Sequence, residues 1–303
     1  MLNAGYSYSE RVGARGAGRT VLGYLSDRYS HSTESTWACR IKDGRVLLGG
    51  EPVASARRLE LGELLTWNRP PWIEPDAPSS FAVLYRDPDL LAVAKPRGLA
   101  AMPGGGFLER TLLRRVQAFD PLASPIHRLG RGTSGITLFT RHKAARRVLV
   151  DAWQRGAVER DYVGLVTGHF PPGTTRIDAP LGPVPHKRLG TVTSVHPNGK
   201  PSISHVTLLE QRPLTSLVAI RIETGRAHQI RIHLAAEGFP LAGDPLYPPG
   251  GIPPEDASAL PGETGYFLHA KLLRFPHPAD GKSVSIDCVP PPPLRGPNMT
   301  GPI

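Results

Sequence analysis

Two stretches of the chain combine side chains that handle protons and anions. The first, residues 126–135, reads Ile-His-Arg-Leu-Gly-Arg-Gly-Thr-Ser-Gly, and the second, residues 222–238, contains Glu-Thr-Gly-Arg-Ala-His-Gln-Ile-Arg-Ile-His. Both join arginines to glycines, and glycine lets backbone N–H groups come close to a phosphate. The first stretch lacks the Gly-Lys-Ser/Thr ending of a phosphate-binding loop, which argues against a nucleoside triphosphatase.

The second stretch predicts a helix that begins at an anion-binding end. We expect a strand over 216–223 and a helix over 228–237 that ends at Gly238. His228 and His233 are five residues apart, about 140° around a helix, so they cannot share a metal ion. Arg226 and the first helical N–H groups form an entrance suited to an anion.

Composition limits the partners and the compartment. The 303 residues carry a formal net charge of +10, which favours a polyanion such as nucleic acid, although arginine richness alone leaves this open. The two cysteines, Cys39 and Cys288, exclude a disulfide framework and a cysteine zinc site, and indicate the reducing cytoplasm. No apolar run reaches the roughly 18 residues that cross a bilayer, so we expect no membrane partner.

The elements that must position these stretches fall into several segments. We predict a flexible N-terminus over 1–20, a small module over 21–68, a proline-rich linker over 69–80, a large domain over 81–290 and a disordered tail over 291–303. The arginines of the first segment are also compatible with a transit peptide.

The expected secondary structure is mixed in both folded segments. In the small module we predict helices near 21–25 and 35–42 and short strands over 45–48, 51–53 and 61–65. In the large domain we predict paired strands over 81–85 and 90–94, a strand over 136–140 and a helix over 141–155.

Several blocks, in order along the chain, resemble one enzyme family. The loop at 127–135 is similar to His-Arg-Leu-Asp-x-x-Thr-Ser-Gly of the RluA-type pseudouridine synthases, and the block at 223–247 matches their Glu-Thr-Gly-Arg-x-His-Gln-Ile-Arg-x-His-Leu and Gly-Asp-x-x-Tyr. Residues 95–99, 159–168 and 267–278 resemble further motifs of that family. The resemblance covers about residues 81–290 and implies an α+β fold around a central, mainly antiparallel mixed sheet. It also implies that a small S4-like RNA-binding module precedes this domain.

The resemblance assigns roles to particular residues. Tyr162 would stack on the target base and help to remove the proton from C5. A tyrosine suits both tasks, because it has a flat apolar ring and a phenolic oxygen that can accept a proton if its pKa is lowered. Arg231 would pair with the family's catalytic Asp. The residues expected to contact RNA are His127, Arg128, Arg131, Thr133, Ser134, Gly135, Arg226, His228 and Gln229. No cofactor and no metal are implied, and we expect a monomer.

The loop departs from the family at the catalytic position. Gly130 stands where the family has the Asp that acts on the ribose, and glycine can be neither nucleophile nor base. No other carboxylate lies on the loop, and Asp161 should point away from Tyr162. Arg231 would then face an empty position.

Three interpretations remain open. The chain is a pseudouridine synthase acting on ribosomal or transfer RNA that recruits another carboxylate, a catalytically impaired RNA-binding protein with the same fold, or a basic α/β protein with another reaction. The joint presence of Tyr162, Arg231, His127 and Arg128 favours the first.

Overall fold

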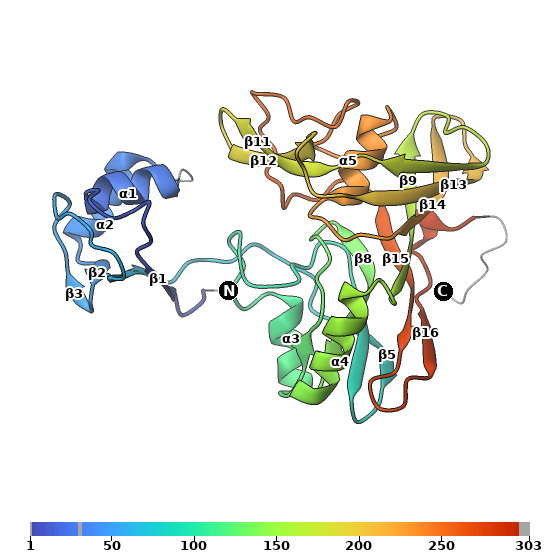
Figure 1. Cartoon of the computed structure of the whole chain (residues 1–303), viewed down its shortest axis with the longest axis horizontal. Helices are drawn as coiled ribbons and strands as arrows, with labels where there is room; N and C mark the ends of the chain where they lie inside the picture. The colour runs from blue at the N-terminus through green and yellow to red at the C-terminus, as the bar shows by residue number, and fades with distance from the viewer. Residues whose placement is uncertain (1, 30–31, 297–303) are drawn as a thin grey trace. The chain divides into compact units, whose positions relative to one another are not determined.

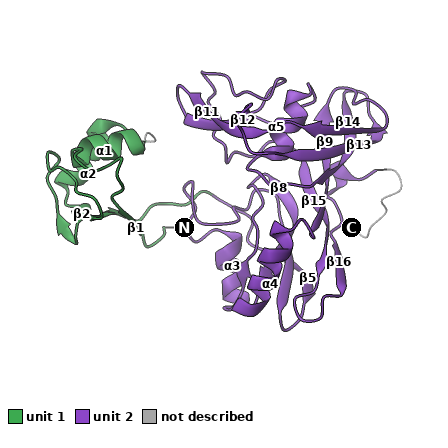
Figure 2. Ribbon diagram, viewed as in Figure 1, with its two compact units in different colours: residues 1–75 green, residues 76–303 purple. Residues whose placement is uncertain are grey.

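The computed structural model describes residues 2–29 and 32–296, and the chain divides into two compact units, Met1–Pro75 and Asp76–Ile303 (Figure 2). Figure 1 labels their helices and strands. Within the described ranges, none of the helices has the length and apolar character needed to span a bilayer.

The first unit packs two helices on a four-stranded antiparallel sheet of order β1-β4-β2-β3. Its elements are β1 (Tyr6–Arg11), α1 (Val21–Arg28), α2 (Glu34–Lys42), β2 (Val46–Leu48), β3 (Glu51–Pro52) and β4 (Leu64–Arg69). Both helices begin at threonine caps, because the hydroxyls of Thr20 and Thr33 accept the N–H three residues on. Trp37 and Leu25 pack with Leu65 in one core.

This unit is larger than the module predicted over 21–68. The N-terminal segment is not flexible throughout, because β1 pairs along its whole length with β4 and Val12 is buried. In its sequence, Tyr-Ser-Tyr-Ser-Glu-Arg, the two tyrosines alternate with serines, a short strand signal that the prediction of a flexible segment missed. β4 also runs to Arg69, inside the predicted linker, and the unit ends at Pro75.

The second unit is an α+β domain around a ten-stranded sheet, as predicted. The main path is β10-β13-β14-β9-β15-β8-β6-β5, with β16 beside β15 and β7 beside β8, and a separate β11-β12 hairpin. Among the described strands, β8 and β15 run parallel and the other pairs are antiparallel. The strands and helices, in chain order, are β5 (Ala82–Arg86), β6 (Leu90–Lys95), α3 (Leu112–Phe119), β7 (Ser124–Pro125), β8 (Thr133–Thr140), α4 (Lys143–Gln154), β9 (Glu159–Thr167), β10 (Thr174–Asp178), β11 (Leu181–His186), β12 (Gly190–Val195), β13 (Ile203–Gln211), β14 (Thr215–Ile222), α5 (Gln229–Ala236), β15 (Leu268–Pro276), β16 (Ser283–Asp287) and η1 (Pro292–Leu294).

Alternate residues of the strands place the helices on two faces of the sheet. Leu91 and Val93 of β6 pack on α3, whereas Leu90 and Ala92, which alternate with them, pack on α4. On the other half of the sheet, α5 packs against β13, β14 and β15. The site described below lies on the face covered by α4 and α5.

The C-terminal segment is ordered as far as it is described. Leu294 in η1 is 1% exposed and packs with Val163 and Leu217. Arg212 donates to the carbonyls of Pro293 and Arg295, both at 2.8 Å. The predicted disorder is therefore wrong for 291–296, because a single leucine anchors the proline-rich chain. Residues 297–303 lie outside the described residues.

Candidate active site

The register of the sheet sets three strands of the site side by side. β15 lies between β8 and β9, and Ala270 is paired with Gly135 on one side and with Tyr162 on the other. Directly paired residues point to the same face, so Tyr162 shares its face with Thr133, two residues before Gly135. Tyr162 also lies against the core cluster that contains Ile230 of α5. The predicted tyrosine and loop are thus brought together.

Several loop residues expected to contact RNA are instead turned into the protein. Nε2 of His127 accepts the N–H of Leu138 at 3.0 Å, and its ring stacks on Trp153 with centroids 4.9 Å apart. Burial, helped by the positive charge of Arg160, lowers the pKa of His127 to about 3, so the ring is neutral. His127 holds the loop rather than presenting a charge.

The Thr-Ser-Gly end of the loop locks β8 to β15. The Ser134 hydroxyl lies 2.9 Å from Nδ1 of His269. Gly135, at φ +109°, approaches Ala270 so closely that a Cβ there would lie 2.2 Å from its carbonyl oxygen. Thr133 is likewise buried. These three residues are buried and hold β8 against β15. The residues of the loop that are available to RNA are therefore their exposed neighbours.

The exposed part of the loop consists of Arg128, Gly130 and the partly exposed Arg131. The buried Lys95 holds the backbone of this loop, because its Nζ donates to the carbonyls of Leu99 and Arg131 at 2.8 and 3.3 Å. Burial, with Arg131 nearby, lowers the pKa of Lys95 to about 7. The Lys-Pro-x-Gly motif therefore clamps the loop, a role that its short sequence did not reveal.

Arg160 lies two residues before Tyr162 on the same face of β9. It is 7% exposed, donates to the carbonyl of Glu223 at 2.7 Å, and its guanidinium lies 5.5 Å from the Trp153 ring centroid. No carboxylate among the described residues pairs with it, and its Nε has no hydrogen-bond partner there. Burial raises the pKa of Tyr162, and Arg160 opposes that rise. The lowered pKa that would let the phenolic oxygen of Tyr162 accept a proton is therefore not found.

The segment before α5 presents one exposed cation and an unusual backbone. Arg226 is exposed, and its Nε donates to the carbonyl of Pro201 at 3.3 Å. His228 precedes α5 at φ +58°, caps it with no side-chain hydrogen bond, and places Nδ1 2.9 Å from the Tyr247 hydroxyl. Burial, with Arg231 nearby, lowers the pKa of His228 to about 4. An uncapped helix start beside an arginine suits an anion.

Gln229 is internal, contrary to its expected contact with RNA. Its amide oxygen accepts from the Thr224 hydroxyl and the Arg226 N–H, at 2.8 and 3.1 Å, and its amide nitrogen donates to the carbonyl of Ile203 at 2.9 Å. The first two contacts hold the turn before α5, and the third ties it to β13. The glutamine shapes the Arg226 turn and does not face a ligand.

Arg231 does not face an empty position, and that prediction is wrong. Its Nε and Nη2 donate to the two carboxylate oxygens of Asp244 at 2.6 and 2.7 Å, with side-chain exposures of 3% and 1%. Asp244 also accepts the N–H groups of Leu246 and Tyr247. Burial lowers the pKa of Arg231, but the contacts with Asp244 outweigh it and the net shift is upward. The pair is a bidentate, internally satisfied ion pair.

Asp161 faces away from Tyr162, as expected. Its two oxygens accept from Nε and Nη2 of Arg221 at 2.6 and 2.7 Å. Both side chains border a cavity of about 590 Å³ that also includes His205 and Lys271. Tyr162 also lines this cavity, whereas Arg160 is not among the lining residues.

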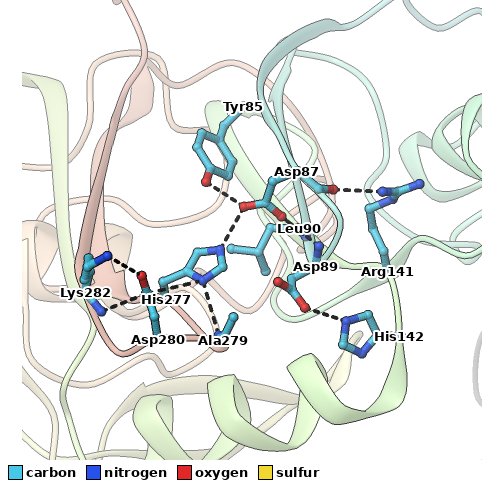
Figure 3. A network of polar contacts seen from close by, with 10 residues as sticks. All are labelled: Tyr85, Asp87, Asp89, Leu90, Arg141, His142, His277, Ala279, Asp280 and Lys282. Carbon is cyan, nitrogen blue, oxygen red and sulfur yellow. Dashed lines mark hydrogen bonds and ion pairs between the residues drawn. The ribbon is translucent and has the colours of Figure 1, made fainter.

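A cluster of two aspartates and a histidine lies near the β5–β6 turn (Figure 3). Asp87, Asp89 and His277 are close enough to share a metal ion. Asp87, however, already accepts the Tyr85 hydroxyl at 2.6 Å and Nε2 of His277 at 2.8 Å, together with two backbone N–H groups. These contacts join β5 to the end of β15, so the cluster braces the sheet.

Comparison with known proteins identifies relatives across most of the chain. Residues 89–236 match the RNA pseudouridylate synthase family model. An uncharacterized RNA pseudouridine synthase of Synechocystis is 37% identical over 92% of this chain and 97% of its own length. RNA pseudouridine synthase 5 of Arabidopsis thaliana is 34% identical over 97% of this chain and 94% of its own.

A second bacterial relative and a solved structure belong to the same group of enzymes by name. Ribosomal large subunit pseudouridine synthase D of Escherichia coli is 34% identical over 86% of this chain and 83% of its own length. The structure of human RNA pseudouridylate synthase domain containing 1 has a TM-score of 0.56 at 24% identity, covering 74% of this chain and 89% of that one. The latter likeness establishes the fold.

Proposed function

The chain belongs to the RNA pseudouridylate synthase family, and we propose that it isomerises uridine to pseudouridine in ribosomal or transfer RNA at the face shared by Tyr162 and the Gly130 loop. The observation that carries this proposal is the row Gly135, Ala270 and Tyr162 across β8, β15 and β9. This row supports the proposal because it sets Tyr162, the residue proposed to stack on the base, near the loop proposed to face the ribose.

The reaction breaks the N1–C1′ bond of uridine, turns the base and rejoins it through C5. Tyr162 presents a partly buried ring on which a base can stack, and its phenolic oxygen is the group proposed to remove the C5 proton. Because burial raises the pKa of Tyr162, the opposing charge of Arg160 is what favours proton removal. Arg160 therefore belongs to the proposed machinery, beside the residues inferred from sequence.

The exposed cations Arg128, Arg131 and Arg226 are the proposed phosphate contacts. The first 75 residues hold ten Lys and Arg against eight Asp and Glu, so most of the +10 charge belongs to the second unit. Phosphate binding by counterion release then depends mainly on that unit. We propose that the first unit makes additional RNA contacts as an S4-like module, that the protein is monomeric, and that it works in the cytoplasm.

Tritium release from RNA labelled at uridine C5 tests the function. The unaltered protein should release tritium from the RNA of cells that lack the gene, whereas Tyr162→Phe should bind this RNA equally and release none. As a control, Tyr85→Phe removes a hydroxyl bonded to Asp87 at the far end of β5 and should behave as the unaltered protein.

The missing aspartate favours one alternative, an RNA-binding protein without chemistry. Gly130 is the observation behind it. RNA binding with no tritium release by the unaltered protein would establish that alternative. Release by the unaltered protein rejects it.

A further inference from the structure

The glycine at position 130 is required by space rather than by its backbone. Gly130 is not among the residues with positive φ, so its backbone conformation is open to other residues. A Cβ at this position would, however, lie 2.9 Å from the phenolic oxygen of Tyr266 and 3.6 Å from the hydroxyl oxygen of Thr133. The Tyr266 hydroxyl therefore occupies the space into which a side chain at 130 would extend.

Tyr266 is fixed in this place from several sides. A Cβ on Gly132 would lie 2.7 Å from its Cζ, and the guanidinium of Arg231 lies 4.4 Å from its ring centroid. Its chain neighbour Gly265 approaches Gly243 so closely that a Cβ would lie 2.3 Å from the Gly243 carbonyl oxygen. With 2% of its surface exposed, Tyr266 cannot swing away to admit a side chain at 130.

The ring also separates the loop from Arg231. The guanidinium packs on the tyrosine face and completes its charge pairing with Asp244 on another side. A carboxylate oxygen at position 130 would lie two bonds beyond Cβ, which is about the reach at which the Tyr266 oxygen is found. This oxygen lies 3.3 Å from the Thr133 hydroxyl.

We propose that Tyr266 supplies, through its phenolic oxygen, the polar group that this active site presents in place of a side chain at position 130. The inference rests on the proposed function. The hydroxyl can donate and accept a hydrogen bond, so it can hold the reacting ribose where glycine cannot. The absence of side chains at Gly130 and Gly132 thus leaves the space that the ring and hydroxyl of Tyr266 occupy.

The substitution Tyr266→Phe removes the oxygen and keeps the ring against Arg231. We expect the turnover number for tritium release to fall by about 100-fold, with little change in KM or in the melting temperature. Tyr85→Phe, which removes another bonded hydroxyl of the same unit, should keep full turnover. Equal turnover by the unaltered protein and Tyr266→Phe would overturn the inference while leaving the proposed function intact. No release by the unaltered protein would overturn both.

A second comparison tests the space argument without activity. Gly130→Ala should lower the melting temperature of the unaltered protein, because its methyl group meets the tyrosine oxygen. The same substitution in the Tyr266→Phe background should lower it much less. An equal loss in both backgrounds would show that the tyrosine oxygen does not fill the space of residue 130, and would overturn the proposal.

Discussion

Arg231 and Arg160, two buried arginines of the second unit, differ in the groups that compensate their charge. Arg231 meets a carboxylate through two short hydrogen bonds and is 3% exposed. Arg160 is 7% exposed and donates to the carbonyls of Ile222 and Glu223, with no carboxylate partner among the described residues. Each lies near a histidine that burial keeps neutral, His228 and His127 respectively.

This difference indicates that the two arginines have different roles. The charge of Arg231 is compensated by Asp244 within the protein, so Arg231 has little attraction left for a ligand. A buried arginine without a counter-charge still attracts anions and carbonyl oxygens. Because it lies beside Tyr162, Arg160 is the better placed of the two to act on the substrate.

The largest predicted effect concerns the paired arginine. Asp244→Ala leaves the guanidinium of Arg231 charged and buried, and should lower the free energy of unfolding by about 3–5 kcal/mol. Urea denaturation measures this loss. As a control, Asp178→Ala breaks the half-exposed pair with Arg176 and should cost less than about 1 kcal/mol. Equal losses in the two variants would show that Arg231 gains nothing from its partner.

The histidines beside the arginines predict how stability depends on pH. The pKa of His127 is lowered to about 3 and that of His228 to about 4, so below the ordinary value of about 6.5 the unfolded chain takes up protons that the folded chain does not. The free energy of unfolding is unaffected by these histidines above about pH 6.5. It decreases as the pH is lowered below that value, by about 2 kcal/mol per histidine at pH 5. Urea midpoints at pH 7.5 and 5 measure the fall. In His127→Gln it should be about 2 kcal/mol smaller, and an unchanged fall would mean that His127 does not contribute.

Removing the unpaired arginine should disturb stability less than breaking the pair. Arg160→Met loses hydrogen bonds to two carbonyls but also removes an uncompensated buried charge, so we expect a net loss of about 1–2 kcal/mol. Tritium release should fall much further, because Tyr162 loses the charge that opposes the rise in its pKa. A loss of stability as large as that of Asp244→Ala, with turnover retained, would reverse the contrast between the two arginines.

Local patterns predicted the elements that carry the site. The helix expected over 228–237 is α5, Gln229–Ala236, and the strand expected over 216–223 is β14, Thr215–Ile222. Both have strong signals, since apolar residues recur at the right period and a glycine ends the helix. β1 had only a short alternation of tyrosine with serine, and its mostly exposed residues form no buried apolar face; the strand is held by its pairing with β4.

The directions of the site's side chains could not be predicted in the same way. Ser134 and Gln229 are polar residues of the motifs from which RNA contacts were expected, yet the side chains of both form hydrogen bonds within the protein. Asp244 and Tyr266 are recognised as neighbours of Arg231 only after the chain folds back between α5 and β15. Sequence spacing determines which residues share a face of one element, whereas these contacts depend on how elements pack.

The smallest predicted effect concerns an exposed arginine that belongs to neither buried setting. Arg226 lies just before α5 and is available to a phosphate, so Arg226→Ala should weaken RNA binding a few-fold and reduce the slope of log affinity against log salt by about 0.7–0.9. Filter binding at several salt concentrations measures the slope. Arg155→Ala removes another exposed arginine, one that pairs with Asp151 at the end of α4, and should leave the slope unchanged. Equal slopes for Arg226→Ala and the unaltered protein would assign the phosphate contacts to Arg128 and Arg131 alone, and the uncapped start of α5 would then have no part in holding RNA.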